Sequence, residues 1–463
     1  MTVIAGVQPL SEAAGAPSHW LAGGRAVPLS PLEGSQSADV AVVGGGFTGL
    51  WSAIRLAEAA PKARIVLLES RYAGFGASGR NGGFAMTMVG RNLHDLVRKV
   101  GPTQARRLHL EMVAALGEIQ RFCADEGIEC GLSHPGLLTV SNGQEQDLRI
   151  RQDLEAARRC GLTDFKPVSA AECRELVAAE RVRLGHLEEH ALLLDPAALV
   201  RGLRDAALRR GVLVFEGSPV TKISPSGYRV GVETPSGRVD ARQVLVATNA
   251  YARSVPRLRR YLFTVCAYVT LTSPLSAAQW AKVGWKRRMG IEDKRVMPHF
   301  HRPTPDGRIL WGGRDAPLLA GPPDPARDRD RRIFARLEES FRWTFPQLSD
   351  LPLEDAWGGP VSGTVSCIPH AGWLDQGRVL YALGYSGHGV GPSALMGKVV
   401  RDLLLGRDTP LTHLPLVTRP LTPLPPGPLQ GPMLSAAQGV LQALDDRSGS
   451  SNPLAHLALR LLQ

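Results

Sequence analysis

A glycine-rich run of the form G-x-G-x-x-G at residues 44–49 constrains the fold of this 463-residue chain more than any other feature. An apolar stretch, 39–43, with the composition of a short buried strand precedes the run, and helical spacing of apolar residues over 47–60 follows it. Pro61 ends this helix, and the next strand is expected at 64–69. The order strand, helix, strand predicts a βαβ unit and therefore a parallel sheet.

The spacing within this unit is typical of a dinucleotide-binding turn. Gly44 permits the tight turn, Gly46 lets a pyrophosphate approach the backbone, and Gly49 lets the helix pack closely on the strand. The helix N-terminus offers unpaired N–H groups and the positive end of a dipole to the phosphates. Glu69, 20 residues after Gly49, closes the second strand, where a carboxylate accepts hydrogen bonds from the ribose hydroxyls.

Three further segments favour FAD over a nicotinamide nucleotide. A second glycine-rich run, 74–83, follows the second strand directly and offers a nest of backbone N–H groups for a second stretch of the cofactor. An apolar strand at 244–248 ends in a turn of small residues, and a third glycine-rich segment, 384–390, precedes a helix. With residues 44–49, these segments resemble the FAD-dependent D-amino-acid oxidase superfamily, in particular its branch of gamma-glutamylputrescine and aminophosphonate oxidoreductases. The resemblance runs from about Trp20 to the C-terminal helix.

This resemblance implies how FAD is held. The second run would bind the ribityl-phosphate side, the backbone of Val220 would contact the adenine, and residues 387–390 would lie at the pyrimidine edge of the flavin. There the N-terminus of a helix expected at 391–405 would stabilise the negative charge of the reduced ring. The FAD-binding residues predicted in this way are Gly44, Gly46, Phe47, Thr48, Gly49, Glu69, Ser70, Gly76, Ala77, Ser78, Arg80, Asn81, Gly82, Val220, Thr248, Gly387, His388, Gly389 and Val390.

We expect FAD to be bound without a covalent link. Some relatives use a histidine, whose place here is taken by Arg80, and others a cysteine, near whose place this chain has Gly359. Ser366 stands where an acid is common in the family, and its neighbour Cys367 is expected to be an inert buried thiol.

The substrate wall is expected on an antiparallel sheet over about 256–315. Within it, Arg302 either clamps a carboxylate or phosphonate of the substrate or pairs with an acid on the neighbouring hairpin strand, Asp306 or Asp315. His388 is expected to contact the flavin, and a role in proton transfer is the weaker alternative. The predicted catalytic or substrate-contacting residues are His388, Arg302, His301 and Tyr268, and Trp311 and Tyr385 are further aromatic candidates that sheet packing would explain equally well.

These observations predict a mixed α/β fold with a Rossmann-like FAD-binding domain and an antiparallel-sheet substrate domain. The first has a mostly parallel sheet and is assembled from the discontinuous segments 38–90, 190–255 and 354–410. The expected substrate domain combines 91–189 with 256–353. We expect regular structure from Ala38, a helix over 92–125, a capping box at Ser169 and a hairpin turn at Asp306–Gly307. Residues 1–37 are interpreted as an N-terminal arm pinned by Trp20, and 411–463 as a Pro-rich tail followed by an amphipathic C-terminal helix.

The composition restricts the class of protein further. Hydrophobic residues make up 44% of the chain and charged residues 21%, which is a globular composition. No apolar run is long enough to cross a membrane, no secretory leader is recognisable, and the six cysteines form no C-x-x-C pair, so a reduced, cytoplasmic protein is expected. The net charge of +11 is spread along the chain, and no nucleic-acid partner is expected. The H-x-x-E-H match at 186–190 is interpreted as chance, and no metal site is predicted.

The resemblance implies an FAD-dependent oxidoreductase that oxidises the C–N bond of a primary or secondary amine. Its substrate would be an amino acid, a polyamine conjugate or an aminophosphonate; hydride would pass to flavin N5, and the resulting imine would be hydrolysed. Oxygen or another acceptor would reoxidise the flavin, and an oligomer is possible. Three alternatives stay open: a flavoprotein of the same fold acting on modified tRNA, a dehydrogenase that reduces a membrane quinone, and a binding or regulatory protein that holds FAD structurally.

Overall fold

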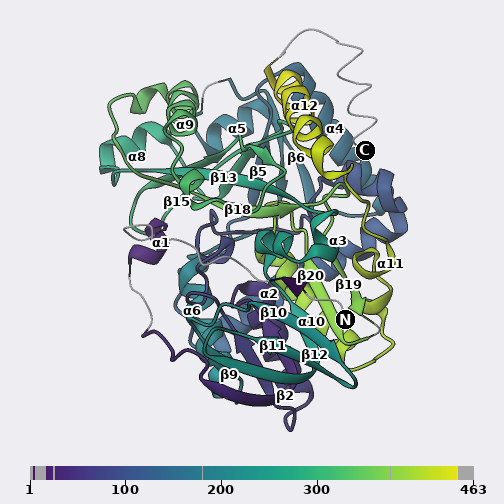
Figure 1. Cartoon of the computed structure of the whole chain (residues 1–463). Helices are drawn as coiled ribbons and strands as arrows, with labels where there is room; N and C mark the ends of the chain where they lie inside the picture. Colours follow the sequence, from purple (N-terminus) through teal and green to yellow (C-terminus); the bar gives the residue numbers. More distant parts are fainter. Residues whose placement is uncertain (1–3, 6–16, 24–26, 180, 376, 447–463) are drawn as a thin grey trace.

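The computed structural model describes residues 4–5, 17–23, 27–179, 181–375 and 377–446. Figure 1 shows two halves, one above the other, each built on its own sheet. The lower half carries β2, β9 and β12 with the helices α2, α6 and α10, and the upper half carries β13, β15 and β18 with α8, α9 and α12. The mixed α/β fold expected from the sequence is thereby confirmed.

The lower sheet has a parallel centre with an antiparallel extension. Among the described residues it contains nine strands, and β12, β2, β3 and β9 are neighbours in parallel, with Val40 opposite Ile65 and Val43 opposite Leu68. The strands, in spatial order, are β1 (Ile4–Ala5), β10 (Lys222–Ser226), β11 (Arg229–Glu233), β12 (Gly237–Val246), β2 (Gly34–Val43), β3 (Ile65–Leu68) and β9 (Leu213–Phe215), with β20 (Val379–Leu383) parallel to β12 and β19 (His370–Asp375) antiparallel to β20.

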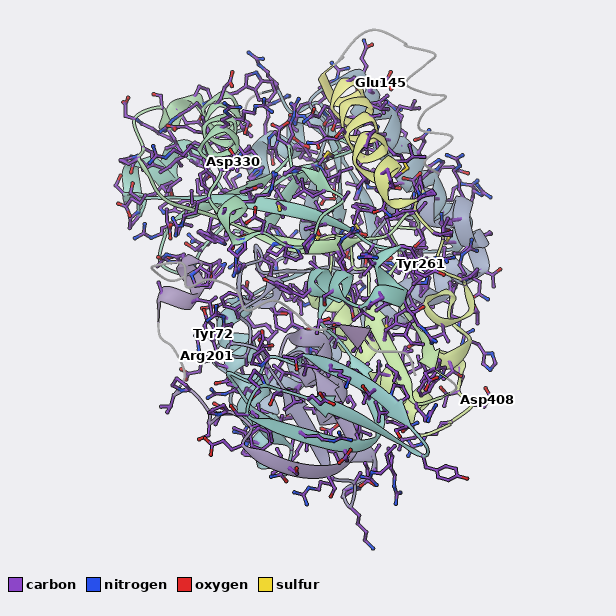
Figure 2. All side chains as sticks on the ribbon, in the orientation of Figure 1. Tyr72, Glu145, Arg201, Tyr261, Asp330 and Asp408 are labelled. Carbon is purple, nitrogen blue, oxygen red and sulfur yellow. The ribbon has the colours of Figure 1, made fainter. Side chains whose placement is uncertain are left out.

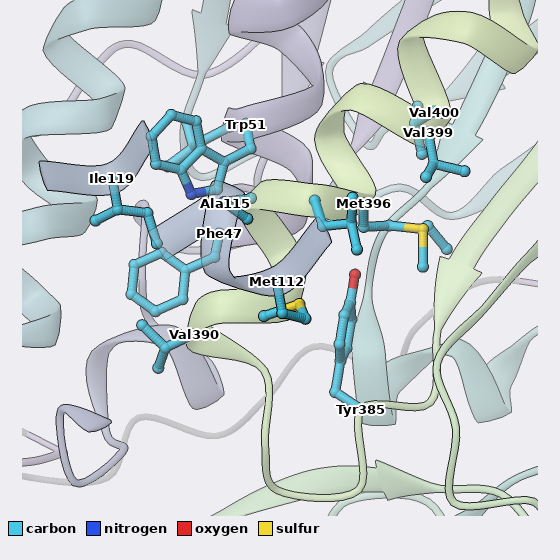
Figure 3. Packing of buried hydrophobic residues seen from close by; sticks show 14 of the residues in the cluster. Phe47, Trp51, Met112, Ala115, Ile119, Tyr385, Val390, Met396, Val399 and Val400 are labelled. Atoms are coloured by element: carbon cyan, nitrogen blue, oxygen red, sulfur yellow. The ribbon is translucent and has the colours of Figure 1, made fainter. Parts of the chain in front are cut away.

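Helices cover one face of this sheet and its antiparallel strands fold over the other, so both faces of the central strands are buried and apolar. β3 is buried at all four positions, and α2 (Phe47–Ala59) crosses from β2 to β3. α10 (Val390–Leu404) packs directly on α2, because Gly397 lacks a side chain where a Cβ would come within 2.8 Å of Trp51. Figure 3 shows Trp51, Met112 and Val390 converging in this layer.

The upper sheet is mostly antiparallel. Its described strands, in spatial order, are β17 (Leu318–Leu319), β13 (Phe263–Thr272), β16 (Ile309–Gly313), β15 (His299–Pro303), β14 (Gly290–Asp293), β5 (Leu137–Val140), β7 (Leu184–Glu188) and β6 (Phe165–Ser169), with β18 (Leu353–Gly363) on β13. Only the pair β14 and β5 runs parallel among the described strands of this sheet. Its core is aromatic, because Phe341 and Phe345 from α9 and the turn after it pack against Trp311 of β16.

The remaining elements connect or cover the two sheets. β4 (Phe84–Ala85) and β8 (Leu192–Leu193) form a short antiparallel pair. The other helices are α1 (His19–Ala22), α3 (Leu93–Asp125), α4 (Gln144–Cys160), α5 (Ala170–Leu176), α6 (Pro196–Arg209), α7 (Pro256–Arg259), α8 (Ala277–Val283), α9 (Arg331–Thr344), α11 (Pro415–Thr418) and α12 (Gly427–Asp446). No helix in the described ranges combines the length and hydrophobicity that a membrane crossing requires.

The structure corrects several expected elements. Regular structure begins before Ala38, since α1 and the start of β2 precede it, and Trp20 of α1 is buried, with its indole N–H 2.9 Å from the carbonyl oxygen of Asn81. The helix expected at 92–125 is kinked at Gly101, where the backbone φ is 79°. α8 and α9 were not predicted; α8 lies inside the span interpreted as strands and has its own capping box at Ser276.

The C-terminal region differs too, because α12 begins at Gly427 and continues through Pro432, inside the segment expected to be irregular. By contrast, the capping box predicted at Ser169 and the hairpin turn at Asp306–Gly307 are confirmed. All six cysteines lie in the described ranges and are free thiols.

Replacing Phe341 with alanine tests the aromatic core of the upper sheet. Its side chain is fully buried, so the substitution leaves a cavity that costs about 3–5 kcal/mol of unfolding free energy. Leu110→Ala on α3 is the control, since that leucine is 47% exposed and its loss should cost less than about 0.5 kcal/mol. Denaturant unfolding followed by circular dichroism measures both; equal losses in the two variants would contradict the packing described.

Candidate active site

The largest concentration of sequence-predicted residues lines a cleft at the carboxyl ends of the parallel strands. Val43, Leu68 and Val246 mark the ends of β2, β3 and β12 at its floor. The cleft encloses about 1370 Å³, including the part open to solvent. Such a position, beside the carboxyl ends of parallel strands, is where open α/β sheets bind their ligands. We call it the dinucleotide cleft.

Two glycines, which have no side chain, shape the floor of this cleft. Gly44 has a φ of +113°, and a Cβ there would lie 2.7 Å from the carbonyl oxygen of Ala247 at the end of β12. A Cβ on Gly49 would lie 1.9 Å from the carbonyl oxygen of Gly44. The turn therefore fits tightly between α2 and β12 only because both residues are glycine. Gly44 lines the cleft, whereas Gly49 lies beneath the turn and does not.

The N-terminus of α2 faces the cleft. The backbone N–H of Phe47 donates to Ser78 Oγ at 2.9 Å, and the N–H of Gly45 donates to Glu69 Oε2 at 2.7 Å. The first N–H groups of a helix have no acceptor within the helix, so this end of α2 can bind an anion such as a pyrophosphate. Thr48 lines the cleft here, and its Oγ1 lies 2.7 Å from the hydroxyl of Tyr385.

Glu69 closes one end of the cleft, together with Ser70 and Val220. Besides Gly45, its carboxylate accepts hydrogen bonds from the N–H of Arg71 and the hydroxyl of Ser70, each at 3.0 Å. Burial raises the pKa of Glu69 above its ordinary value, and these hydrogen bonds oppose that shift. The carboxylate is therefore held in place beside the cleft, as a ribose-binding acid requires.

The second glycine-rich run forms a compact turn along the cleft wall. Asn81 organises it, because its amide donates to the carbonyl oxygens of Ala77 and Ser78 and accepts from the N–H of Gly83. Gly76, Ala77, Ser78 and Asn81 line the cleft.

Two residues of this run that were predicted to bind FAD do not line the cleft. Arg80 is buried with its guanidinium 2.5 Å from Asp328 and its Nε donating to the carbonyl oxygen of Phe75, away from the cleft. Gly82 packs under Phe300, where a Cβ would approach the ring to 2.9 Å. Both therefore act on the shape of the run and do not line the cleft.

The third glycine-rich segment separates this cleft from another. Gly387, Gly389 and Val390 line the dinucleotide cleft, as does Thr248 at the end of β12. His388 lines a second cleft of about 2170 Å³, again including its open part. Burial lowers the pKa of His388 to about 4, so its ring is neutral at pH 7. The two clefts thus lie on either side of residues 387–390.

The second cleft is walled by charged residues from both halves of the molecule. Its lining comes from residues 88–98 at the start of α3, 145–153 of α4, 292–298 of β14 and the turn after it, Cys367, His388, and Leu441 and Leu444 of α12. Figure 2 shows Glu145 of α4 beside α12 in this region. Lys294 forms a buried ion pair with Asp153, and Glu292 is buried beside them.

The predicted substrate residues of the upper sheet do not line either cleft. His301 is buried and stacks on Trp311 with ring centroids 4.6 Å apart, and Tyr268 is 1% exposed with its hydroxyl donating to the carbonyl oxygen of Arg327. Trp311 donates to Ser340 Oγ. These side chains point into the aromatic core, so packing explains them. Tyr385 lines the dinucleotide cleft instead.

Arg302 has neither of the roles considered for it. It is 1% exposed, and its guanidinium donates to the carbonyl oxygens of Gly83 at 2.9 Å and Leu194 at 2.7 Å. Asp306 pairs with Arg308, and Asp315 with Arg336, so neither acid pairs with Arg302. Its side chain joins β15 of the upper sheet to backbone beside β4 and β8.

Sequence reasoning missed Asp153, Glu292 and Lys294. Their signal was weak: Glu292-Asp293-Lys294 is a run of charges at the end of a strand, and Asp153 lies on a helix with many other charges. Only the fold brings α4 and β14 together. His186, from the H-x-x-E-H match, lies in a small pocket that Asp153, Glu292 and Lys294 also line. No group of His, Cys, Asp or Glu in the described ranges is arranged to hold a metal ion.

Comparison with known proteins gives one consistent result. The sequence profile of the DAO family, described as "FAD dependent oxidoreductase", matches residues 39–403. Gamma-glutamylputrescine oxidoreductase of Escherichia coli is 33% identical over 381 residues, which cover 82% of this chain and 86% of that protein. A probable oxidoreductase, OrdL, of Haemophilus influenzae is 28% identical over 387 residues, with the same coverages of 82% and 86%.

Solved structures agree on the fold. Glycine oxidase from Geobacillus kaustophilus superposes with a TM-score of 0.70 at 20% identity and covers 83% of this chain and 100% of its own. L-proline dehydrogenase from P. horikoshii gives a TM-score of 0.68 at 19% identity, covering 84% of this chain and 96% of its own.

Gly49→Ala tests the glycine turn. Its Cβ would collide with the carbonyl oxygen of Gly44, so the turn must open and the bound flavin should fall well below one per chain. Gly117→Ala on α3 is the control, because its Cβ would meet nothing closer than 3.4 Å. Flavin absorbance per protein, measured on variants with native circular dichroism, reports the outcome. Full flavin content in Gly49→Ala would contradict the tight fit described.

Arg302→Met tests the structural role of this arginine. Buried carbonyl oxygens lose their donors, which should cost about 3 kcal/mol of unfolding free energy, while KM for an amine that reduces the flavin stays unchanged. Arg238→Met is the control, since that side chain is 48% exposed. A raised KM with unchanged stability would instead show that Arg302 binds substrate.

Proposed function

Since the chain belongs to the DAO family of FAD-dependent oxidoreductases, we propose that it oxidises the C–N bond of a primary or secondary amine. The observation that carries the proposal is that residues 387–390 lie between two clefts and line both. One has the turn and helix N-terminus that a dinucleotide needs, and the other is open, charged and large enough for a small polar molecule. Two of the proteins described above, gamma-glutamylputrescine oxidoreductase and glycine oxidase, are named for the oxidation of an amine and an amino acid.

FAD is the cofactor of the family, and the dinucleotide cleft fits it. We propose that the N-terminus of α2 binds the pyrophosphate, that Glu69 binds the adenosine ribose beside Val220, and that residues 76–81 hold the ribityl side. Two features of the cleft support this assignment: the close backbone approach at Gly44, and Glu69 fixed at its edge by three hydrogen bonds. When bound, FAD supplies the two-electron acceptor for the reaction.

We further propose that FAD is held without a covalent link. Arg80 stands where some relatives have a histidine, and its side chain is engaged with Asp328. Gly359, near the place of the linking cysteine, lies on β18 with its missing Cβ against Arg80. Cys367 lines the second cleft and not the dinucleotide cleft. Acid precipitation of the protein should therefore release the flavin, and its absorbance should be found in the supernatant.

The chain's own residues would position the substrate and stabilise charge. The N-terminus of α10, which begins at Val390, places the positive end of a helix dipole beside residues 387–389, where negative charge can be stabilised. His388 lies between the clefts, and its Nδ1 is buried without a hydrogen-bond partner in the described part of the chain. We propose that this atom bonds to a ligand at the boundary of the clefts, with the neutral ring acting as a hydrogen-bonding group and not as a cation.

An absorbance spectrum of the purified protein, repeated under anaerobic conditions with pooled amines, tests the proposed function. The pools are N-methyl amino acids, polyamines with their gamma-glutamyl conjugates, and aminophosphonates. We expect a flavin spectrum that one pool bleaches, because oxidation of a C–N bond transfers two electrons to the cofactor. Air should then restore the spectrum if oxygen is the acceptor, and a quinone should restore it if it is not.

A flavin spectrum that no pool bleaches would contradict amine oxidation. It would shift the assignment to a substrate on modified tRNA or to a structural flavin, and binding of tRNA at physiological salt would separate these two. Absence of any flavin after reconstitution with FAD would contradict the cofactor assignment itself.

A further inference from the structure

The inner end of the second cleft has more buried carboxyl groups than buried cations. A small pocket lined by Glu188, His186 and His109 adjoins the cleft there, and Asp153, Glu292, Lys294 and Arg91 line both. The guanidinium of Arg91 is bound elsewhere, since it donates to the carbonyl oxygens of Ser366 and Val365. Asp153, Glu292, Lys294 and Glu188 are called the inner wall. Three carboxyl groups of the inner wall thus accompany one ammonium group, and all four side chains are buried.

The single cation of the inner wall is already used. Lys294 forms an ion pair with Asp153, whose carboxylate also accepts the backbone N–H of His94 at 2.9 Å. Both side chains are less than one-tenth exposed. Lys294 and Asp153 therefore neutralise each other, and Lys294 is poorly placed to bind an anionic group of a ligand as well.

Glu292 forms no ion pair among the described residues, although Lys294 is close enough to lower its pKa. Its carboxylate accepts one hydrogen bond, from Thr139 Oγ1 at 3.1 Å, and no ion pair. Glu188 is different, because both the N–H and the hydroxyl of Thr87 donate to it. A buried carboxylate with so few partners is costly, and a ligand that brings a cation to it regains much of that cost.

The outer part of the cleft adds an apolar surface. Leu441 and Leu444 of α12 line it, and Asp445 anchors the helix there by accepting the N–H groups of Val296 at 2.8 Å and Met297 at 3.0 Å. Val296 and Met297 lie two and three residues after Lys294 in the turn after β14. A ligand that reaches Glu292 from solvent therefore passes between charged residues and an aliphatic wall.

We propose that Glu292 binds a protonated amino group of the substrate, so that the substrates are aliphatic amines whose bound amino group has no phosphonate beside it. This inference rests on the proposed function for the identity of the second cleft as the substrate site. Glu292 is here a positioning and specificity residue. Leu441 and Leu444 would contact the methylene groups of the same substrate.

Binding of such a cation should depend on pH. Burial raises the pKa of Glu292 to about 7, Glu188 and Asp153 add to the shift, and Lys294 opposes it. Glu292 carries charge only above that pKa, so cation binding should strengthen as the pH rises through about 7. The ionisable groups that share the inner wall and its pocket are Asp153 of α4, Glu188 and His186 of β7, His109 of α3, Lys294 and Arg91, with His388 across the cleft.

Calorimetric titration of the FAD-loaded enzyme with butyltrimethylammonium tests the proposal. This probe has a cation and an aliphatic chain, and its nitrogen has no lone pair, so it cannot be converted to an imine. We expect Glu292→Gln to weaken its binding about tenfold, because the carboxylate attracts the quaternary nitrogen by charge without a hydrogen bond, and to remove the pH dependence. Glu155→Gln is the matched control, because Glu155 lies exposed on α4 and pairs with Arg158; it should leave binding unchanged.

The outcomes separate this inference from the proposed function. If the wild-type enzyme fails to bind the probe, or Glu292→Gln binds it equally well at unchanged flavin content, Glu292 is not the cation site. Tighter binding of methylphosphonate, unaffected by Glu292→Gln, would favour an anionic substrate group. If the probe binds through Glu292 while no amine bleaches the flavin, the cation site stands and amine oxidation fails. The pH series on the wild-type enzyme requires no variant to fold.

Discussion

The close approach of backbone at residues 44–49 is the contact on which the lower half of the molecule depends. Gly44 meets the end of β12, and Gly49 meets Gly44, so that strand, helix and neighbouring strand share one point. Side chains at either position would move α2 away from the sheet, and with it α10, which packs on α2 through Gly397. The N–H groups at the start of α2 are oriented towards the cleft by the same contact. The same glycine contacts therefore determine both the shape of the cofactor site and the packing of the core.

A second set of polar contacts joins the two halves. Arg302 extends from β15 and satisfies carbonyl oxygens beside β4 and β8, and Arg80 extends from the second glycine-rich run to Asp328. Each buried guanidinium has several acceptors, which is the condition under which a buried charge is stable. Because these contacts cross between the two halves, they fix the upper sheet relative to the second glycine-rich run and to the backbone beside β4 and β8.

The parts of the fold predicted from sequence are those encoded locally. The turn at residues 44–49, the capping box at Ser169 and the hairpin at Asp306–Gly307 each depend on neighbours a few residues apart, and their side chains or missing side chains specify them. Arg302 shows the limit of such reasoning. Arginine is equally suited to a carboxylate ligand and to backbone carbonyls, and only the position of Leu194, 108 residues away, decides between them.

The inner wall of the second cleft was beyond prediction for the same reason, and this has a consequence for substrate choice. Asp153 and Lys294 come from different elements, and their pairing leaves Glu292 with a hydrogen bond from Thr139 and no ion pair. A fold shared by many oxidoreductases does not set which amine enters. The balance of charge on α4, β7 and β14 can do so, since a buried carboxylate without a cation attracts ammonium groups and repels phosphonates. In this chain, specificity would therefore reside in a few charges at one end of the upper sheet, while the lower sheet keeps the cofactor in place.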